Sequence, residues 1–334
     1  MKKRTTQRDV ARRAGVSQAA VSLVLNGTGK PSISAETWQR ITDAAQELGY
    51  APNRFAQALR TNRSMTIACL VPDITNPFYP ALIRGVQSVT DGANYDLITI
   101  STDGLPDRER HFLDWARQGR VDGVIGVFFS LRARDLKPLV DGGVPVVRIE
   151  SAKKHGGEIP IDDIFVDSHA AALAVTRYLI GRGHRRVAMV AGRGGPQGVR
   201  VEGYRQALIE AGGEPHVVID DEFSEIGGVR AAKAILASGY RPSAVFAAND
   251  LMAIGVIQAL REERMAVPHD VAVVGFDDIS AARMITPPLT TVAQFQREMG
   301  AKAAQTLMER LSGSRHGPGT ALEVPFSLVE RAST

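Results

Sequence analysis

TQRDVARRAGVSQAAVSLVL, residues 6–25, places small and apolar residues where two short helices that cross at a tight turn need them. Ala11 lets the helices approach, Gly15 turns the chain, and Val21 fills the angle between the helices. Other apolar residues complete a small core: Val10, Ala14, Val16, Val24 and Leu25. This spacing predicts a DNA-binding helix-turn-helix.

The ends of the two helices carry capping signals. Thr6 with Asp9 forms an acidic variant of the capping box at the start of the first helix, and Ser17 is placed to cap the second. The second helix then presents a group of residues outward near its N-terminal end, the end that a recognition helix puts into the major groove: Gln18, Ala19, Ser22 and Leu23.

The alternative, an ordinary helical hairpin with no DNA function, is disfavoured by the distribution of charge. Residues 1–63 contain 11 Lys or Arg and 4 Asp or Glu, a net charge of +7, whereas the remaining residues sum to −3. A basic N-terminal region on a mildly acidic body is what neutralisation of DNA phosphates requires.

A third helix is predicted over residues 34–48, capped by Ser34 and followed by Gly49. One face of it is apolar and would close the core of a headpiece spanning residues 1–50: Trp38, Ile41, Ala45 and Leu48. We therefore expect Trp38 to pack inside the headpiece and not to stack on DNA bases. Residues 51–64 form a short helix-capable stretch, opened by Pro52, and a polar basic linker. Two turns of isolated helix are unstable in water, so this hinge should form fully only when something orders it.

The sequence resembles the LacI/GalR family of bacterial transcription regulators. The resemblance rests on DVARRAGVS..AVS.VLNG at residues 9–27, on LGY.PN.FA..L at residues 48–59, and on motifs of the body given below, and it covers essentially the whole chain. It implies a hinge helix that folds on DNA, pairs with its copy in a second subunit and wedges Leu59 into a central minor-groove step, where an apolar wedge bends the duplex. Ordinary linker packing is the alternative role for Leu59.

The same resemblance assigns DNA contacts residue by residue. Tyr50, Asn53 and Ala56 match hinge and backbone contacts. The phosphate contacts would be made by Ser17, Ser22 and Asn26. Operator choice falls to Gln18, Ala19 and Leu23: glutamine can pair with adenine, whereas the two apolar residues offer contacts such as one to a thymine methyl. Half-burial of Leu23 in the headpiece is the alternative, and the operator sequence stays open.

The body, residues 65–334, is predicted to be a two-lobed α/β structure with parallel, doubly wound sheets. Apolar runs that suit buried parallel strands recur between amphipathic stretches, at residues 66–71, 97–101, 123–128, 145–149, 186–191, 217–220, 244–247 and 271–276. The resemblance implies a periplasmic-binding-protein-like fold whose chain crosses between lobes near Ile161, Thr290 and Ala321. The first lobe would hold about 65–160 and 291–320, and the second about 161–290 and 321–334.

Polar residues gather where the predicted strands end, as ligand-binding loops of α/β sheets do. Three lie in motifs of the second lobe: Arg200 in R.EGY, Asn249 in AANDLMAIG and Asp277 in VVGFDD. By resemblance, one set lines an effector cleft between the lobes: Asp73, Phe78, Glu150, Arg200, Asn249 and Asp277. Carboxylates, Asn and Arg hydrogen-bond vicinal hydroxyls, and an aromatic ring stacks on a sugar, so a sugar effector is predicted.

Alternatives stay open for each of these residues: Asp250 in the same motif could cap a helix, Arg200 could sit in a surface ion pair, and Phe78 could be lobe core. The effector itself could be a nucleoside, a phosphorylated metabolite or a protein co-regulator. Glu150 stands where some sugar-responsive relatives have the shorter Asp, which leaves the pocket size open.

Other classes of protein fit less well. The sequence has no HExxH or Walker motif, its histidines lack metal-ligand spacing, and Cys69 falls in a predicted strand, so we expect no enzyme activity, no metal and no cofactor. The strongest rival is an exported solute-binding protein, which needs an apolar signal segment, whereas residues 1–15 are basic. We therefore expect a cytoplasmic homodimer on a pseudo-palindromic operator, with no membrane partner. Residues 278–291 resemble the family's interface between subunits.

Overall fold

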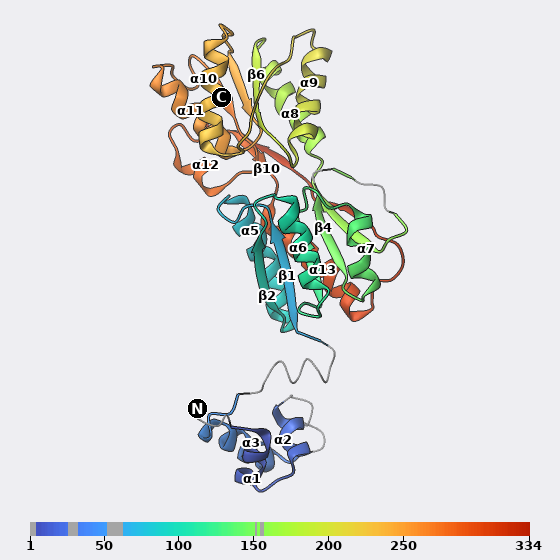
Figure 1. The fold of residues 1–334 in the computed structure, drawn as a ribbon. Coiled ribbons are helices and arrows are strands. Elements are labelled where there is room, and N and C mark those ends of the chain that lie inside the picture. Colours follow the sequence, from blue (N-terminus) through green and yellow to red (C-terminus); the bar gives the residue numbers. More distant parts are fainter. Residues whose placement is uncertain (1–4, 26–32, 52–62, 151, 154–156) are drawn as a thin grey trace. The chain divides into compact units, whose positions relative to one another are not determined.

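The computed structural model describes residues 5–25, 33–51, 63–150, 152–153 and 157–334 (Figure 1). Contacts between residues divide the chain into two compact units, Met1–Ser64 and Met65–Thr334, which we call the headpiece unit and the body. Four residues assigned to DNA contacts by sequence, Asn26, Asn53, Ala56 and Leu59, lie outside the described residues.

The headpiece unit contains the helices α1 (Gln7–Ala14), α2 (Gln18–Leu25) and α3 (Ala35–Glu47). Both predicted caps of the helix-turn-helix are present: Thr6 and Asp9 form a reciprocal capping box, and Ser17 Oγ accepts a hydrogen bond from the backbone N–H of Ala20 (3.2 Å). Gly15 takes the left-handed conformation (φ 65°) that turns the chain between α1 and α2, a conformation that glycine adopts without steric cost. The predicted helical headpiece is confirmed.

The three helices bury one small apolar core. Val10, Val21 and Ile41, one from each helix, are fully buried in it, and Trp38 packs against its edge. Trp38 therefore belongs to the packing of this unit, as the apolar face of α3 predicts.

The first lobe of the body is built on a parallel six-stranded sheet in the order β11-β5-β4-β3-β1-β2. Its strands are β1 (Thr66–Val71), β2 (Asp96–Ser101), β3 (Gly123–Gly126), β4 (Val146–Glu150), β5 (Ile161–Phe165) and β11 (Ala321–Glu323). Two cores show that α5 (Phe78–Thr90) and α13 (Gln296–Ser312) cover one face, and α6 (Pro106–Ala116) and α7 (Ala133–Asp141) the other. A short 3-10 turn, η1 (Asp91–Ala93), follows α5.

The second lobe has the same layered plan on a smaller scale. Its parallel sheet, in the order β7-β6-β8-β9, is formed by β6 (Val187–Gly192), β7 (His216–Asp220), β8 (Ala244–Ala247) and β9 (Ala272–Val274). Helices α8 (Ser168–Gly181) and α9 (Gln197–Glu210) cover one face, and α10 (Glu225–Ala237) and α11 (Asp250–Glu262) the other. The short helix α12 (Ser280–Met284) and the antiparallel pair β10 (Thr291–Ala293) and β12 (Ser327–Val329) complete the lobe.

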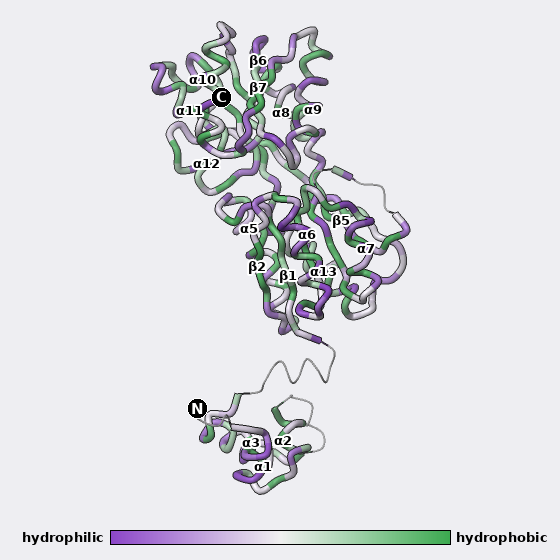
Figure 2. The backbone as a smooth tube through the Cα atoms, in the orientation of Figure 1, coloured by the Kyte–Doolittle hydropathy of each residue, from purple (hydrophilic) through white to green (hydrophobic). Residues whose placement is uncertain are grey.

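Hydropathy follows this layering: hydrophobic residues run along the central strands, and hydrophilic and hydrophobic residues alternate along the covering helices (Figure 2). Helices α5 and α13 approach closely because each presents a glycine to the backbone of the other. A Cβ on Gly85 would lie 2.0 Å from the carbonyl oxygen of Arg297, and one on Gly300 would lie 2.1 Å from that of Leu82. This contact locks α13, which comes late in the chain, against α5, which comes early.

The lobe boundaries drawn from sequence need correction. Residues 161–165 and 321–323 were placed in the second lobe, but they form β5 and β11 of the first-lobe sheet. The three crossings between lobes therefore lie after Phe165, Ala293 and Glu323, a few residues later than predicted. The strand 161–165 escaped prediction because Asp162 and Asp163 interrupt its apolar run.

Those two carboxylates are buried because each meets an arginine. Asp162 is bonded by Arg310 from α13 (Nε to Oδ2, 2.7 Å), and this contact lowers its pKa against the effect of burial. Asp163 receives two hydrogen bonds from Arg148 on β4 (2.7 and 2.9 Å). Paired and hydrogen-bonded charges are the form in which ionised groups are tolerated inside a protein.

Candidate functional site

The outward face of α2 matches the prediction from sequence. Gln18, Ala19 and Leu23 are exposed, Leu23 to 40 %, whereas Val21 and Val24 face the headpiece core. Other predicted contact residues include the exposed Ser17 and the half-buried Ser22. Helix α2 therefore presents one amide and two apolar side chains near its N-terminal end, with a polar rim.

Tyr50 has a second role in this unit. Its ring packs against the headpiece core, and its backbone N–H donates to the carbonyl of Ala45 (2.8 Å), which closes the chain over the end of α3. Its assigned DNA contact stays a prediction.

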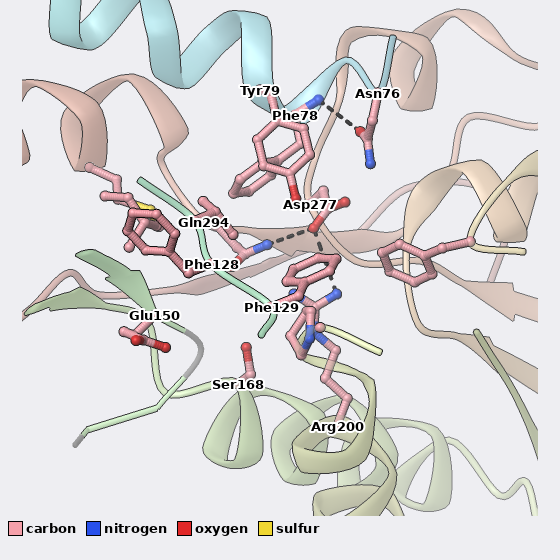
Figure 3. A pocket seen from close by; sticks show the side chains of 16 residues that line it. Asn76, Phe78, Tyr79, Phe128, Phe129, Glu150, Ser168, Arg200, Asp277 and Gln294 are labelled. Atoms are coloured by element: carbon pink, nitrogen blue, oxygen red, sulfur yellow. Dashed lines mark hydrogen bonds and ion pairs between the residues drawn. The ribbon is translucent and has the colours of Figure 1, made fainter. Parts of the chain in front are cut away.

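In the body, a cleft of about 220 Å³ is lined by residues of both lobes (Figure 3). The first lobe contributes residues at the start of α5, in the loop after β3 and at the end of β4: Asn76, Phe78, Tyr79, Val127, Phe128, Phe129, Ile149 and Glu150. The second lobe and the crossings contribute Ser168, Gly195, Pro196, Arg200, Phe223, Asp277 and Gln294, and Met299 comes from α13 of the first lobe. Parallel strands direct their carboxyl ends toward this cleft, as the topology of α/β sheets requires.

Arg200 and Asp277 face each other in the cleft, both almost completely buried. Their nearest charged atoms are 3.8 Å apart, and the guanidinium lies 3.7 Å from the centre of the Phe276 ring. Arg200 Nη1 donates to the backbone carbonyl of Ala248, and Asp277 Oδ1 accepts from Gln294 (2.6 Å; Figure 3). Among the described residues, none accepts a hydrogen bond from Arg200 Nε. An unmade hydrogen bond at a buried guanidinium is costly, so a polar ligand atom there would be stabilising.

Burial also sets the protonation of this pair. It raises the pKa of Asp277 to about 8, an effect that the Arg200 guanidinium opposes. It lowers the pKa of Arg200, while the Asp277 carboxylate works in the other direction. The pKa of Tyr79 is raised, first by burial and then by the charge of Asp277. The carboxyl group at the base of the cleft is thus poised to gain or lose a proton near neutral pH.

Glu150 lines the cleft from the end of β4, and its carboxylate is contacted by Arg148. Arg148, two residues earlier on the same strand, lies 3.5 Å from its carboxylate and also makes the paired bonds to Asp163. Arg148 therefore offsets part of the negative charge of Glu150, and the position of Glu150 is supported by a residue that does not line the cleft.

Aromatic rings form much of the wall. Phe78 and Tyr79 pack edge to face, with ring centres 5.1 Å apart, and Phe78 is oriented by its backbone N–H, which donates to Asn76 Oδ1 (3.0 Å; Figure 3). Ser168 Oγ, buried in the cleft wall, finds no hydrogen-bond partner among the described residues. Rings beside unsatisfied polar atoms suit a ligand that has both flat apolar faces and hydroxyl groups.

Four residues predicted for the cleft line it: Phe78, Glu150, Arg200 and Asp277. The other two lie elsewhere. Asn249 is fully buried, caps α11 by accepting from the N–H of Met252 (2.8 Å), and donates to the carbonyl of Phe223 (3.4 Å). Asp73 is exposed and bonds Thr75 in its own turn.

Asp250 also has a structural role. Its carboxylate accepts from the N–H of Ile279 (2.9 Å) and from the hydroxyl of Thr291, which ties α11 to the segment leaving the second lobe. Burial raises its pKa to about 6.

Several lining residues were not predicted from the sequence. Phe128 was counted as the end of a strand, but β3 ends at Gly126, so Phe128 belongs with Phe129 to the loop that follows it. Phe223 and Gln294 come from loops whose sequence carries no motif. A signal was available for the two phenylalanines, because large apolar residues directly after a buried strand fall at the ligand-binding edge of the sheet.

The described part of the chain contains no cluster of His, Cys, Asp or Glu that could hold a metal ion. Cys69 is buried in β1, where burial raises the pKa of its thiol to about 12. None of the described helices has the length and apolar character needed to cross a membrane.

Comparison with known proteins bears on both units. The model of bacterial regulatory proteins of the lacI family matches residues 6–53, and the model of the periplasmic binding protein-like domain matches residues 176–334. The regulator DegA of Bacillus subtilis is 35 % identical over 338 residues, covering 99 % of this chain and 98 % of DegA. The ribose operon repressor of Escherichia coli K12 is 37 % identical over 315 residues, covering 92 % and 93 %. The solved lac repressor dimer, bound to operator and the anti-inducer ONPF, superposes with a TM-score of 0.87 at 26 % identity and 99 % coverage of both chains.

The chain belongs to the LacI family of bacterial transcription regulators, as its motifs predicted. It is a helix-turn-helix DNA-binding regulator with a periplasmic-binding-protein-like body, and this family is one of regulators and not of enzymes.

Proposed function

We propose that this regulator is a repressor of a carbohydrate-utilisation operon and that a small sugar-like effector binds in the cleft between the lobes. The observation that carries the proposal is the buried Arg200–Asp277 pair, which leaves Arg200 Nε without an acceptor among the described residues in a cleft walled by aromatic rings. Sugar hydroxyls accept from guanidinium groups and donate to carboxylates, and their apolar ring faces stack on aromatic side chains.

The balance of charge favours a neutral ligand over a phosphorylated one. Arg200 is the one cationic side chain among the described residues that line the cleft. Glu150 adds a carboxylate, which would repel a phosphate group. Recognition of phosphate normally uses several arginine or lysine donors, and the described lining supplies one.

A nucleoside is the second candidate. The rings of Phe78, Phe128 and Phe223 could stack on a base, and the same polar groups could bond a ribose. The test below therefore includes nucleosides beside sugars.

On DNA, we propose a homodimer that binds a pseudo-palindromic operator in the bacterial cytoplasm, with base contacts from Gln18, Ala19 and Leu23. One headpiece reads few base pairs, so two half-sites are needed for a specific site. Residues 278–291 are the proposed subunit contact, and they include Met284, which is 80 % exposed. Large apolar side chains left in water commonly mark an interface.

The effector class is tested by thermal unfolding of the full chain with a panel of pentoses, hexoses, disaccharides, sugar phosphates and nucleosides. A ligand present at 100 times its Kd stabilises a protein by about 2.7 kcal/mol, a shift that is readily measured. A shift with one neutral sugar supports the proposal. A shift only with nucleosides selects the second candidate, and one only with phosphorylated sugars contradicts the charge argument.

The division of labour between the units is tested with Arg200→Ala. This variant should bind operator DNA as the wild type does but lose the response to the sugar found in the panel, because its side chain lies in the cleft and not in the headpiece unit. Arg177→Ala is the matched control, since Arg177 lies on the surface of the same lobe and pairs with Glu210 (2.8 Å). A normal response in Arg200→Ala would show that Arg200 does not bind the effector.

A further inference from the structure

A buried carboxylate lies behind the cleft, in a helix that does not line it. Glu109 on α6 is fully buried, and its two oxygens accept four hydrogen bonds from one short loop. Three come from the backbone N–H groups of Phe129 (2.8 Å), Ser130 (3.0 Å) and Leu131 (3.1 Å), and the fourth comes from the hydroxyl of Ser130 (2.5 Å).

This arrangement fixes the loop between β3 and α7. Charge-assisted hydrogen bonds to a buried carboxylate are about twice as strong as neutral ones, and four of them offset the cost of burying its charge. The next backbone N–H, that of Arg132, is taken by Asp135 (2.8 Å). Every backbone N–H from residue 129 to residue 132 is thus held by a carboxylate, so the loop has one well-defined conformation.

The loop places one aromatic ring between the lobes. Phe129 lines the cleft and is 40 % exposed, which is unusual for a large apolar side chain held by so rigid a loop. A Cβ on Gly104 of the first lobe would lie 3.0 Å from its ring, and a Cβ on Gly195 of the second lobe would lie 2.9 Å from it. Both glycines have positive φ (63° and 57°), so the ring contacts backbone on each side where other residues are disfavoured.

We propose that Phe129 determines the size of ligand that the cleft accepts, and that Glu109 is the positioning residue that holds the Phe129 ring across the mouth of the cleft. The inference rests on the proposed sugar effector and deepens it. A single sugar ring fits beneath the phenyl ring, whereas a second ring attached to it has to displace Phe129 from its contact with Gly195. The lobe-to-lobe contact thus selects for a monosaccharide.

The first test uses D-ribose and cellobiose as probes and measures the Kd of each for the full chain by calorimetry. Wild type should prefer ribose. Phe129→Ala should raise the ratio of cellobiose affinity to ribose affinity at least tenfold, and Glu109→Gln at least threefold in the same direction. In the Phe129→Ala background, Glu109→Gln should change this ratio no further, because it acts through the ring.

Controls separate this role from a general loss of structure. Asp114→Asn makes the same acid-to-amide change at an exposed position of α6 and should leave the ratio unchanged. Ser130→Ala removes a single one of the four hydrogen bonds and keeps the test valid if Glu109→Gln does not fold. A ratio unchanged in both Phe129→Ala and Ser130→Ala would overturn the proposal.

The second test needs no ligand. In a Phe129→Trp chain, acrylamide quenching of the added fluorescence, taken as the difference from wild type, reports how firmly the ring is held. Glu109→Gln or Ser130→Ala in this chain should raise the quenching constant about twofold, and Asp114→Asn should not. Equal quenching in all of them would overturn the role of Glu109. If no sugar of the thermal panel binds wild type while quenching rises as expected, the proposed effector class fails and the positioning of residue 129 stands.

Discussion

Two buried arginine–aspartate pairs, one in the sheet of the first lobe and one in the cleft, differ in how completely they are satisfied. In the first lobe, Arg148 makes two parallel hydrogen bonds to Asp163, at 2.7 and 2.9 Å. In the cleft, Arg200 and Asp277 stay 3.8 Å apart, and no described residue accepts from Arg200 Nε. The first pair has the bidentate geometry that arginine and carboxylate prefer, and the second leaves part of its hydrogen-bonding capacity unused.

The difference separates a pair that supports the fold from a pair available for binding. We call Arg148–Asp163 the closed pair, because its facing donors and acceptors are already bonded to each other. We call Arg200–Asp277 the open pair, because Arg200 Nε has no acceptor among the described residues. An unmade hydrogen bond costs free energy that a ligand can recover, which is why perturbed and incompletely bonded groups gather at binding sites. The two pairs should therefore respond in opposite ways to substitution.

The largest expected effect is on stability, in the closed pair. Asp163→Ala leaves Arg148 buried without its bidentate partner and should lower the free energy of unfolding by about 3–5 kcal/mol. Urea unfolding of the full chain, followed by circular dichroism, measures it. A loss below about 1 kcal/mol would show that the closed geometry contributes little and would remove the contrast between the pairs.

The open pair should give the reverse result. Asp277→Asn keeps the shape of the side chain and should change the free energy of unfolding far less than Asp163→Ala does. It should weaken binding of the sugar identified in the thermal panel by about 10- to 100-fold, equivalent to about 1.4–2.7 kcal/mol. Calorimetric titration checks this, and binding equal to wild type would mean that the carboxyl group does not contact the ligand.

The pH dependence of stability sharpens the contrast further. The folded-state pKa of Asp277, about 8, is above its ordinary value, so the folded chain keeps a proton that the unfolded chain releases. The stability from this group is complete below pH 4 and is lost as the pH rises through about 8, by at most about 1.4 kcal/mol per pH unit. Urea unfolding between pH 6.5 and 8, above the pKa of about 6 of Asp250, should show a slope in wild type that is flatter in Asp277→Asn.

A smaller effect is expected beside the open pair, at Asn249. Asn249→Ala removes the cap of α11 and should lower the free energy of unfolding by about 1 kcal/mol. Because its side chain also bonds the carbonyl of Phe223, ligand affinity should fall only slightly. A loss of affinity as large as that of Asp277→Asn would return Asn249 to the group of ligand-contacting residues.

The smallest effect is expected for an ion pair on the surface. Arg177 and Glu210 are bonded at 2.8 Å, as closely as Arg148 and Asp163, but both are largely in water. Glu210→Gln should leave the urea midpoint at pH 7 unchanged within error, since solvent screens exposed pairs. A shift comparable to that of Asp163→Ala would mean that distance, and not burial, sets the contribution of these pairs.

The parts of the fold that the sequence predicted are those set by neighbouring residues. Thr6, Gly15 and Ser17 act within one or two turns of chain, so the headpiece helices and their caps could be placed from sequence. The parallel strands of the body were also found, because β1 and β8 are continuous apolar runs. The strand β5 was missed because Asp162 and Asp163 are tolerated only through arginines that lie 148 and 15 residues away in the chain.

The cleft was predicted less completely, for a similar reason. Arg200 and Asp277 stand in recognisable motifs, and both line it. Asn249 stands in such a motif too, but its side chain is used to cap a helix. Phe129 follows a buried strand, which indicates the ligand-binding edge, but the position of its ring depends on Glu109, a residue 20 positions earlier whose carboxylate holds the loop.

The packing of α13 against α5 has a consequence for how this chain is made. The apolar face of β1 and α5 emerges from the ribosome early, but the helix that covers it ends at Ser312 and is synthesised only after the core strands of the second lobe. The headpiece unit can fold as soon as residues 1–64 have emerged, whereas the first lobe must wait with an uncovered surface for most of translation. We therefore expect nascent chains of intermediate length to expose more apolar surface than the complete chain and to aggregate more readily.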